Sequence, residues 1–138
     1  MMRKRIFIDT SGFYSLLIKK DNAHNMAVKM LRKASKEKIC FVTTDYVLDE
    51  TTTLLKVRGH KHLIREFLEN TFSSNVCSIE WMDASRFDDT KKLFLKYSDH
   101  AWSFTDCFSF VIMRELNLTK ALSKDKHFSE AGTQPLLA

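Results

Sequence analysis

The stretch Arg5-Ile6-Phe7-Ile8-Asp9-Thr10-Ser11-Gly12 decides the fold that this sequence predicts. Its three central apolar residues are too few for a helix and are typical of a strand buried on both faces. In open α/β sheets such a strand delivers a polar side chain to the ligand crevice at the carboxyl edge. Asp9 is therefore a candidate functional residue. The alternative is that Asp9 only caps the next helix, although Thr10 and Ser11 can cap it and would leave Asp9 surplus to that role.

The rest of the chain alternates apolar strands with helical stretches. We expect strands at residues 6–8, 39–42, 76–81 and 119–122, with residues 134–138 as a short edge strand. We expect helices at residues 12–19, from a cap at Asp21 or Asn22 through Ala34, and at 46–58, 60–72, 83–97 and 103–116. Each crossover is long enough for a parallel connection. The pattern predicts a three-layer α/β/α sandwich around a parallel sheet of four or five strands.

Length and composition indicate one cytoplasmic domain. The 138 residues fit a single domain, residues 1–138. The three cysteines form no CxxC pair, which favours a reducing compartment over a zinc site or a disulfide framework. The basic start is followed by an apolar run too short for a signal peptide, and no stretch has the length of a membrane helix. A net charge of +5 is compatible with a polyanionic partner, although solvated helix faces are the better explanation of most of the lysines.

Glu50 is the acid whose position is hardest to explain by structure alone. Helical spacing in the expected helix at 46–58 places Glu50 between Leu54 and Val57 on its apolar side, whereas Asp49 points the other way. A buried lone carboxylate is costly unless it finds a partner or takes up a proton. We expect that partner to be a bound cation, with a buried ion pair to an arginine or lysine as the alternative.

Two further acids stand at the ends of elements. Asp106 lies three residues after Ser103, a capping-box spacing, in a helix that is apolar nearly all round. Capping explains an acid in the first turn but not the apolar flanks, so Asp106 is a functional candidate. Asp125 follows the strand at 119–122, with capping of a short helix as its alternative role. If that strand neighbours the first one, Asp9 and Asp125 project into one crevice.

A cluster of these acids requires cations, because converging carboxylates repel one another. The candidate cluster consists of Asp9, Glu50, Asp106 and Asp125. Oxygen ligands suit Mg²⁺ or Mn²⁺, and one or two such ions support phosphodiester hydrolysis. The hydroxyls suited to orient a carboxylate or a water are those of Thr10, Ser11 and Thr105. The five histidines have no regular spacing in the sequence. They are interpreted as surface residues, or as residues that contact the site residues without binding the ion.

Four motifs together resemble the successive motifs of the PIN-domain family. In order, they are Ile6-Phe7-Ile8-Asp9-Thr10-Ser11, Val47-Leu48-Asp49-Glu50-Thr51, Ser103-Phe104-Thr105-Asp106-Cys107 and Leu122-Ser123-Lys124-Asp125-Lys126-His127-Phe128. The resemblance covers nearly the whole chain. It implies a metal-dependent ribonuclease whose acidic cluster is the one named above.

The resemblance is strongest to small bacterial and archaeal members, many of them VapC-type toxins of toxin–antitoxin pairs. For these it implies an RNA substrate, a homodimer and a small antitoxin partner. Ser123 stands where members of the family often have Thr or Ala, and the family offers no histidine to map.

Three other functions are alternatives for a chain with this pattern of acids. A phosphatase of the haloacid-dehalogenase type needs a second acid two residues after Asp9, where this chain has Ser11. A receiver-like phosphoacceptor domain expects an acidic pair near the first strand and a late lysine, which fits the acids of this chain poorly. A non-catalytic RNA- or partner-binding module would keep the basic surface without any acid on an apolar helix face. Glu50 is therefore the residue that separates the nuclease from the binding module.

Overall fold

The computed structural model describes residues 4–138 and is built on a five-stranded parallel sheet in the order β3-β2-β1-β4-β5. The strands are β1 (Arg5–Ile8), β2 (Cys40–Thr44), β3 (Cys77–Glu80), β4 (Lys120–Leu122) and β5 (Gln134–Pro135). β1 lies at the centre, between β2 and β4. The α/β fold with a parallel sheet is confirmed, and the short edge strand brings the number of strands to five.

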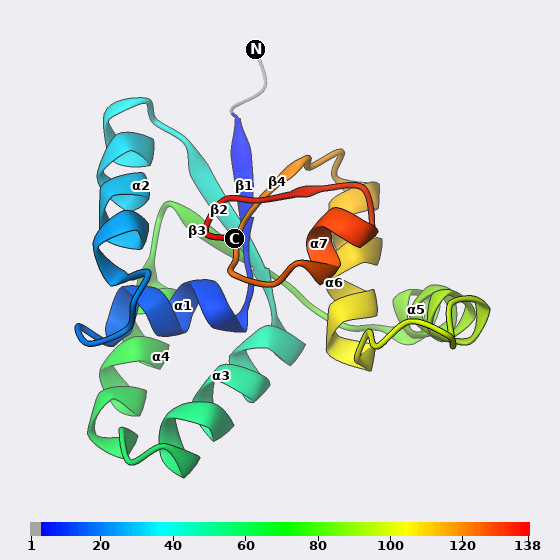
Figure 1. Ribbon diagram of the computed structural model, residues 1–138, viewed down its shortest axis with the longest axis horizontal. Coiled ribbons are helices and arrows are strands. Elements are labelled where there is room, and N and C mark those ends of the chain that lie inside the picture. Colours follow the sequence, from blue (N-terminus) through cyan, green and yellow to red (C-terminus); the bar gives the residue numbers. More distant parts are fainter. Residues whose placement is uncertain (1–3) are drawn as a thin grey trace.

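Helices cover both faces of this sheet. They are α1 (Thr10–Leu17), α2 (His24–Lys36), α3 (Asp45–Val57), the 3-10 turn η1 (Lys61–Leu63), α4 (Ile64–Ser73), α5 (Ala84–Lys96), α6 (Phe104–Glu115) and α7 (His127–Glu130). Figure 1 shows α1, α2 and α4 on one side of the sheet and α6 and α7 on the other, with α5 beyond α6. The carboxyl end of β1 leads directly into α1, and that of β2 leads directly into α3. The polar residues that follow these strands therefore share one edge of the sheet.

The core lies on both faces of β1. Phe7 is fully buried, and its ring lies 6.2 Å from that of Phe128 in α7. Residues 107–113 of α6 are all buried, as expected for a helix that is apolar nearly all round. Burial of an aromatic or aliphatic side chain contributes about 1.5–3 kcal/mol, so α6 and β1 supply much of the free energy that holds the layers together.

Three local expectations are corrected. The single helix expected at 60–72 is divided into η1 and α4. The first helix begins at Thr10 rather than Gly12. The apolar spacing of the helix expected at 83–97 predicts that Phe87 and Phe94 point inward, but they stay 45% and 38% exposed and pack against the Phe104 ring at 5.1 and 5.6 Å. Since α5 covers α6 rather than the sheet, only part of its apolar side is buried.

Gly12 allows α1 to begin against the end of β4. The residue is buried, and a Cβ atom built on it would collide with the backbone carbonyl oxygen of Leu122. Any side chain at position 12 would therefore push α1 away from β4. The close approach brings Asp9, which immediately precedes α1, to the loop that follows β4.

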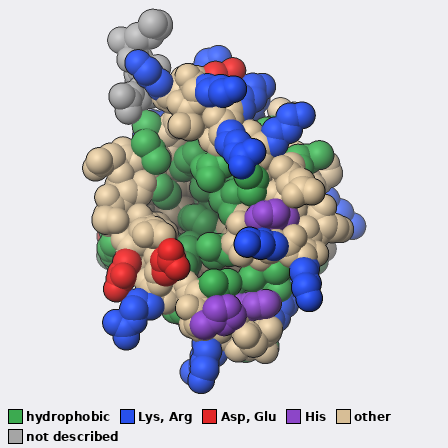
Figure 2. Space-filling model, turned by 90° about the vertical axis from the view of Figure 1, so that its left-hand side faces the viewer, with side chains coloured by type: hydrophobic (Ala, Val, Ile, Leu, Met, Phe, Trp, Pro, Cys, Tyr) green, Lys and Arg blue, Asp and Glu red, His purple; other side chains and the backbone are tan. Residues whose placement is uncertain are grey.

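The outer surface is basic and partly apolar. Figure 2 shows the face that carries α2 and α4, where apolar side chains gather in a hollow with lysines and arginines around it. On α2, Met26 and Leu31 are 50% and 39% exposed. Within residues 4–138, no helix has both the length and the apolar character required to cross a membrane.

Candidate functional site

A cleft opens at the carboxyl ends of β1 and β4. Its volume is about 360 Å³, and it is lined by residues of α1, α3, α6 and the loop after β4. All four acids of the predicted cluster line it, namely Asp9, Glu50, Asp106 and Asp125. β1 and β4 are parallel neighbours, and the chain order reverses at this point of the sheet. Ligand crevices of open α/β sheets form at such points.

Asp9 both caps α1 and faces the cleft. Its Oδ1 accepts hydrogen bonds from the backbone N–H of Gly12 and the hydroxyl of Ser11, each at 2.9 Å. Its Oδ2 accepts from the hydroxyl of Ser123 at 2.7 Å. The interpretation that Asp9 is surplus to capping is therefore wrong, because α1 begins at Thr10 and Asp9 itself is the N-cap.

Burial makes the charged form of Asp9 costly. Only 7% of the residue is exposed, and desolvation raises the pKa of its carboxyl from 3.8 to about 7. Hydrogen bonds from Ser123, Gly12 and Ser11 oppose this rise, while repulsion from Asp125 adds to it. Near neutral pH Asp9 is therefore divided between its protonated and ionised forms, and a nearby cation would shift it toward the carboxylate.

Two serine hydroxyls join β1 to the loop after β4. The Ser11 hydroxyl accepts from the backbone N–H of Lys124 at 2.8 Å, and the Ser123 hydroxyl accepts from that of Asp125 at 2.9 Å. Both hydroxyls also donate to Asp9. Ser11, predicted to orient a carboxylate or a water, is in hydrogen-bond contact with the Asp9 carboxylate. Sequence reasoning gave Ser123 no such role, although its place directly after β4 mirrors that of Asp9 after β1.

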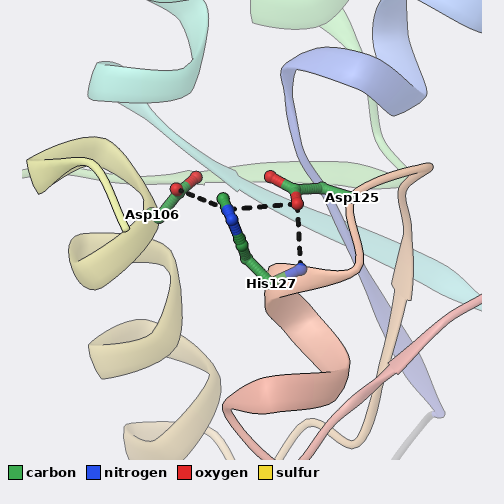
Figure 3. Close-up of side chains that lie close together, drawn as sticks. All are labelled: Asp106, Asp125 and His127. Carbon is green, nitrogen blue, oxygen red and sulfur yellow. Dashed lines mark hydrogen bonds and ion pairs between the residues drawn. The ribbon is translucent and has the colours of Figure 1, made fainter. Parts of the chain in front are cut away.

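Asp106, Asp125 and His127 form a second group in the cleft region. Figure 3 shows their side chains pointing toward one another from α6, the loop after β4 and the start of α7. His127 Nδ1 lies 3.2 Å from Asp125 Oδ1 and 3.5 Å from Asp106 Oδ2. One potential ligand atom from each residue lies within 4.8 Å of the others. Burial, followed by repulsion from Asp125, raises the pKa of Asp106 against the lowering effect of the Ser103 backbone N–H.

Capping explains part of this arrangement. Ser103 and Asp106 form a reciprocal capping box, with two hydrogen bonds of 3.0 Å. Asp125 Oδ1 accepts from the backbone N–H of His127 at 2.9 Å. The capping role raised for Asp106 is therefore a real contact, whereas the N-cap of α7 is Lys126 and Asp125 instead holds the turn that precedes this helix. Neither contact uses all the acceptor capacity of these carboxylates, since an ionised carboxylate offers about four lone-pair sites.

His127 is the site residue that sequence reasoning missed. The spacing of the five histidines from one another does not single it out. A carboxylate that accepts from the backbone N–H two residues later holds the intervening turn tightly, and Asp125 has this relation to His127. The two-residue spacing between Asp125 and His127 in the sequence could therefore have indicated that His127 lies beside Asp125.

Glu50 lies in the cleft wall but is not buried. The buried side of α3 consists of Val47, Leu48, Thr51 and Leu55, while Glu50 and Asp49 are both exposed. The expectation of a carboxylate within an apolar stripe is wrong, because the stripe was taken to include Val57, which is 77% exposed at the end of the helix. Glu50 lines the cleft with Leu54, whereas Asp49 does not line it.

The three supporting hydroxyls differ in their placement. Thr10 and Ser11 line the cleft, and Thr105 does not. Thr10 Oγ1 and His127 Nδ1 are buried without a hydrogen-bond partner among residues 4–138, since the approach of Nδ1 to the two carboxylates is poorly aligned for a hydrogen bond. Buried polar atoms left unpaired are uncommon and often mark a place for water or an ion.

The donor set fits a hard divalent cation with its waters. The carboxylates of Asp9, Asp106 and Asp125 provide oxygen ligands, and His127 adds a nitrogen that Mn²⁺ accepts more readily than Mg²⁺. Burial raises the pKa of Asp9 and of Asp106, repulsion from Asp125 adds to both shifts, and a bound cation would oppose them. The unpaired Thr10 hydroxyl at the same cleft offers a further contact for a metal-bound water.

Comparison with known proteins identifies the fold and the family. The PIN domain model matches residues 6–133. The 23S rRNA-specific endonuclease VapC20 of Mycobacterium tuberculosis is 31% identical over 128 residues, covering 92% of this chain and 94% of that protein. A VapC ribonuclease of Archaeoglobus fulgidus is 37% identical over 128 residues, covering 88% of this chain and 78% of that protein.

A solved structure agrees with these sequence matches. The crystal structure of M. tuberculosis VapC20, described as a sarcin-ricin loop cleaving toxin, superposes with a TM-score of 0.84 at 26% identity. The match covers 93% of this chain and 95% of that one. The resemblance inferred from the four sequence motifs is thereby confirmed. The chain belongs to the PIN domain family and is similar throughout to VapC ribonucleases.

Proposed function

We propose that this protein is an endoribonuclease that hydrolyses RNA phosphodiester bonds at the cleft, with Mg²⁺ or Mn²⁺ as cofactor. The observation that carries the proposal is the convergence of Asp9, Asp106 and Asp125 from three separate elements into one cleft. Carboxylates that served only to cap their own helices would have no reason to converge on one cleft. The similarity to VapC ribonucleases over most of the chain supports the same activity.

The proposed roles follow from the environments of the acids. Asp9, Asp106 and Asp125 would hold the ion, and His127 would complete or orient this set. When bound, Mg²⁺ or Mn²⁺ lowers the pKa of a coordinated water and offsets charge on a phosphate. Glu50 is exposed on the opposite wall, where its carboxylate can orient the attacking water and accept its proton.

The partners of this chain are proposed from its relatives. VapC20 is named for its action on 23S rRNA, so a structured RNA loop is a reasonable substrate class for this protein. We further propose a cytoplasmic homodimer that is the toxin of a toxin–antitoxin pair, as the resemblance to VapC-type proteins implies. The apolar hollow and surrounding cations seen in Figure 2 are compatible with an acidic, amphipathic antitoxin segment.

Digestion of structured and single-stranded RNA by the purified protein tests the proposal. We expect cleavage that requires Mg²⁺ or Mn²⁺, stops with EDTA and falls at least about 100-fold in Asp9→Asn. Cleavage that survives both changes would contradict a carboxylate metal site. RNA binding without any cleavage would instead identify a binding module.

The two neighbouring acids of α3 provide a matched comparison. Glu50→Gln should lower cleavage at least about 100-fold, because it removes the carboxylate that lines the cleft. Asp49→Asn changes the charge equally on an exposed residue outside the cleft, and its rate should stay within about twofold of the parent. Equal losses in the two variants would remove the proposed role of Glu50.

A further inference from the structure

A second cavity adjoins the acidic cleft. It has a volume of about 440 Å³, and it shares Tyr14, Asp21, Arg58 and Lys124 with the cleft. The remaining lining comes from the end of α1, the turn before α2 and the turn after α3, with Lys20 and His60 among the residues. The two cavities are therefore neighbours, and the four shared residues form the rim between them.

Lys124 is fixed on this rim by contacts at both ends. Its backbone N–H donates to the Ser11 hydroxyl, beside Asp9, and its Nζ donates to the two carboxylate oxygens of Asp21 at 3.0 and 3.3 Å. Asp21 also accepts from the Ser15 hydroxyl at 2.8 Å and from the backbone N–H of Ala23 at 3.0 Å. Burial of Asp21 favours its neutral form, but these hydrogen bonds hold its pKa below the usual value.

This arrangement keeps the ammonium group out of the acidic cluster. Lys124 immediately precedes Asp125 in the chain, so its side chain is a natural neutralising partner for that carboxylate. Asp21 instead binds it at the rim. The acids are thereby left for a divalent ion, and one-third of the Lys124 side chain stays exposed toward solvent. The positive charge is held where a polyanion entering the cleft would pass.

Arg58 supplies a second oriented cation. Its guanidinium lies over the Tyr14 ring, 4.9 Å from the ring centroid. The Tyr14 ring also contacts His60 edge-on, at 6.1 Å. Stacking on an aromatic face fixes the plane of the guanidinium while its N–H groups stay available for a phosphate. Arg58 follows the last residue of α3, about two turns beyond Glu50.

The two cavities differ in charge on either side of the rim. Arg58, Lys124 and Asp21 line both cavities, the second cavity adds Lys20, and the cleft adds four carboxylates. We propose that the rim is a phosphate subsite, where Lys124 and Arg58 bind the backbone of an RNA strand that continues from the acidic cleft into the second cavity. This subsite rests on the proposed ribonuclease function and specifies how its substrate is held.

The salt dependence of RNA binding tests the subsite without requiring cleavage. The probe is a fluorescently labelled single-stranded RNA of mixed sequence, measured by anisotropy with Asp9→Asn protein from about 50 to about 200 mM KCl. Each lost phosphate contact should lower the slope of log affinity against log salt by about 0.7. We therefore expect a decrease of about 0.7 for Lys124→Met or Arg58→Met and about 1.4 for the double variant.

Matched variants distinguish the loss of a phosphate contact at the rim from the loss of one positive charge anywhere on the protein. Lys120→Met and Arg114→Met remove exposed cations from the opposite end of β4 and from the last turn of α6, and they should leave the slope unchanged. Lys124→Arg should preserve the slope, because the charge remains on the rim. Circular dichroism and thermal melts establish that each variant is folded.

The outcomes distinguish this subsite from the proposed nuclease activity. If the wild type cleaves RNA but Lys124→Met and Arg58→Met leave the slope unchanged, the subsite is wrong and the nuclease stands. If the slopes fall as expected but no metal-dependent cleavage is found, the subsite stands and the nuclease is wrong. A polyglutamate peptide whose binding depends on Lys124 and Arg58 but which does not displace the RNA would assign the cations to an acidic protein segment and overturn the subsite.

Discussion

At the scale of single residues, Asp9 shows how one side chain serves fold and site together. Its Oδ1 accepts from the first turn of α1, and its Oδ2 accepts from Ser123 beyond β4. An N-cap contributes about 1 kcal/mol, whereas desolvating an unpaired carboxylate costs several. The second effect is larger, which is why the pKa of Asp9 rises to about 7 despite three hydrogen bonds. Asp9 therefore stabilises α1 as its N-cap, while burial destabilises the ionised form of its carboxyl group.

The pKa of Asp9 leads to a pH prediction for the metal-free protein. The folded state binds the proton more tightly than the unfolded chain, whose carboxyl has the ordinary pKa of 3.8. The free energy of unfolding contributed by Asp9 should therefore decrease as pH rises from about 4 to about 7, by at most about 4 kcal/mol. Above that pH it should stay level.

Urea denaturation in EDTA at several pH values measures this change, and Asp9→Asn is the control because its amide does not titrate. The difference between the two proteins should grow between about pH 4 and pH 7, with Asp9→Asn the more stable at pH 8. Parallel pH curves for the two proteins would mean that Asp9 is not desolvated.

At the scale of elements, helix phase decides which acids reach the cleft. α3 turns Val47, Leu48, Thr51 and Leu55 toward the core, which leaves Glu50 at the cleft edge. The Thr51 hydroxyl donates to the Val47 carbonyl at 2.7 Å, so a polar residue occupies a core position without an unpaired group. A sequence pattern that scores only apolar residues overlooks such a threonine. This omission rotated the predicted helix and placed Glu50 among buried residues.

The approach of α1 to β4 gives a prediction at the same scale. Gly12→Ala places a Cβ against the Leu122 carbonyl oxygen, which is backbone and cannot rotate away. We expect a loss of about 1–3 kcal/mol or more in the free energy of unfolding. RNA cleavage should also fall, because Asp9 and Ser123 are moved apart.

Gly59→Ala is the matched substitution. Gly59 has a φ of +82° with no atom within 4 Å of an added Cβ, so alanine there costs only backbone strain, about 1–2 kcal/mol. Cleavage by folded Gly59→Ala should equal that of the parent. If Gly12→Ala cleaves RNA as well as Gly59→Ala does, the contact between α1 and β4 does not position the site.

At the scale of the whole molecule, the cleft exists only because distant segments meet. Asp9, Asp106 and Asp125 come from β1, α6 and the loop after β4, which the parallel pairing of β1 with β4 brings to one edge. A cation bound there would link both layers of helices through the sheet. Binding should therefore stabilise the fold as a unit rather than one loop.

Metal addition and removal test this link. Mg²⁺ or Mn²⁺ at about 100 times its Kd should raise the free energy of unfolding by about 2.7 kcal/mol, and EDTA should remove the gain. The gain should be larger at pH 8 than at pH 5, since protons compete for Asp9 and Asp106 at the lower pH.

Thermal melts of Asp106→Asn should show little of this gain. Asp89→Asn, a change of the same charge on an exposed residue of α5, should keep all of it. A gain that persists in Asp106→Asn would place the bound ion elsewhere on the protein.

Local sequence signals determined most of the fold and the identity of the four acids. Short apolar runs such as the one before Asp9, and a helix as apolar as residues 107–113, leave few other structures open, because burial depends on the periodicity of neighbouring residues. The order and spacing of the four motifs also predicted the family, which the comparisons confirm. The capping box at Ser103 was readable for the same reason, since it involves residues only three apart.

Only the tertiary structure decided how these residues meet. His127 lies between Asp106 and Asp125, Ser123 reaches Asp9, and Asp21 holds Lys124 outside the acidic cluster. Each of these contacts except the one between His127 and Asp125 joins residues at least 21 positions apart. Such pairs depend on how whole helices and strands are rotated and how closely they approach, and a shift of one residue along a helix is enough to separate them. The local pattern of a sequence does not record that geometry.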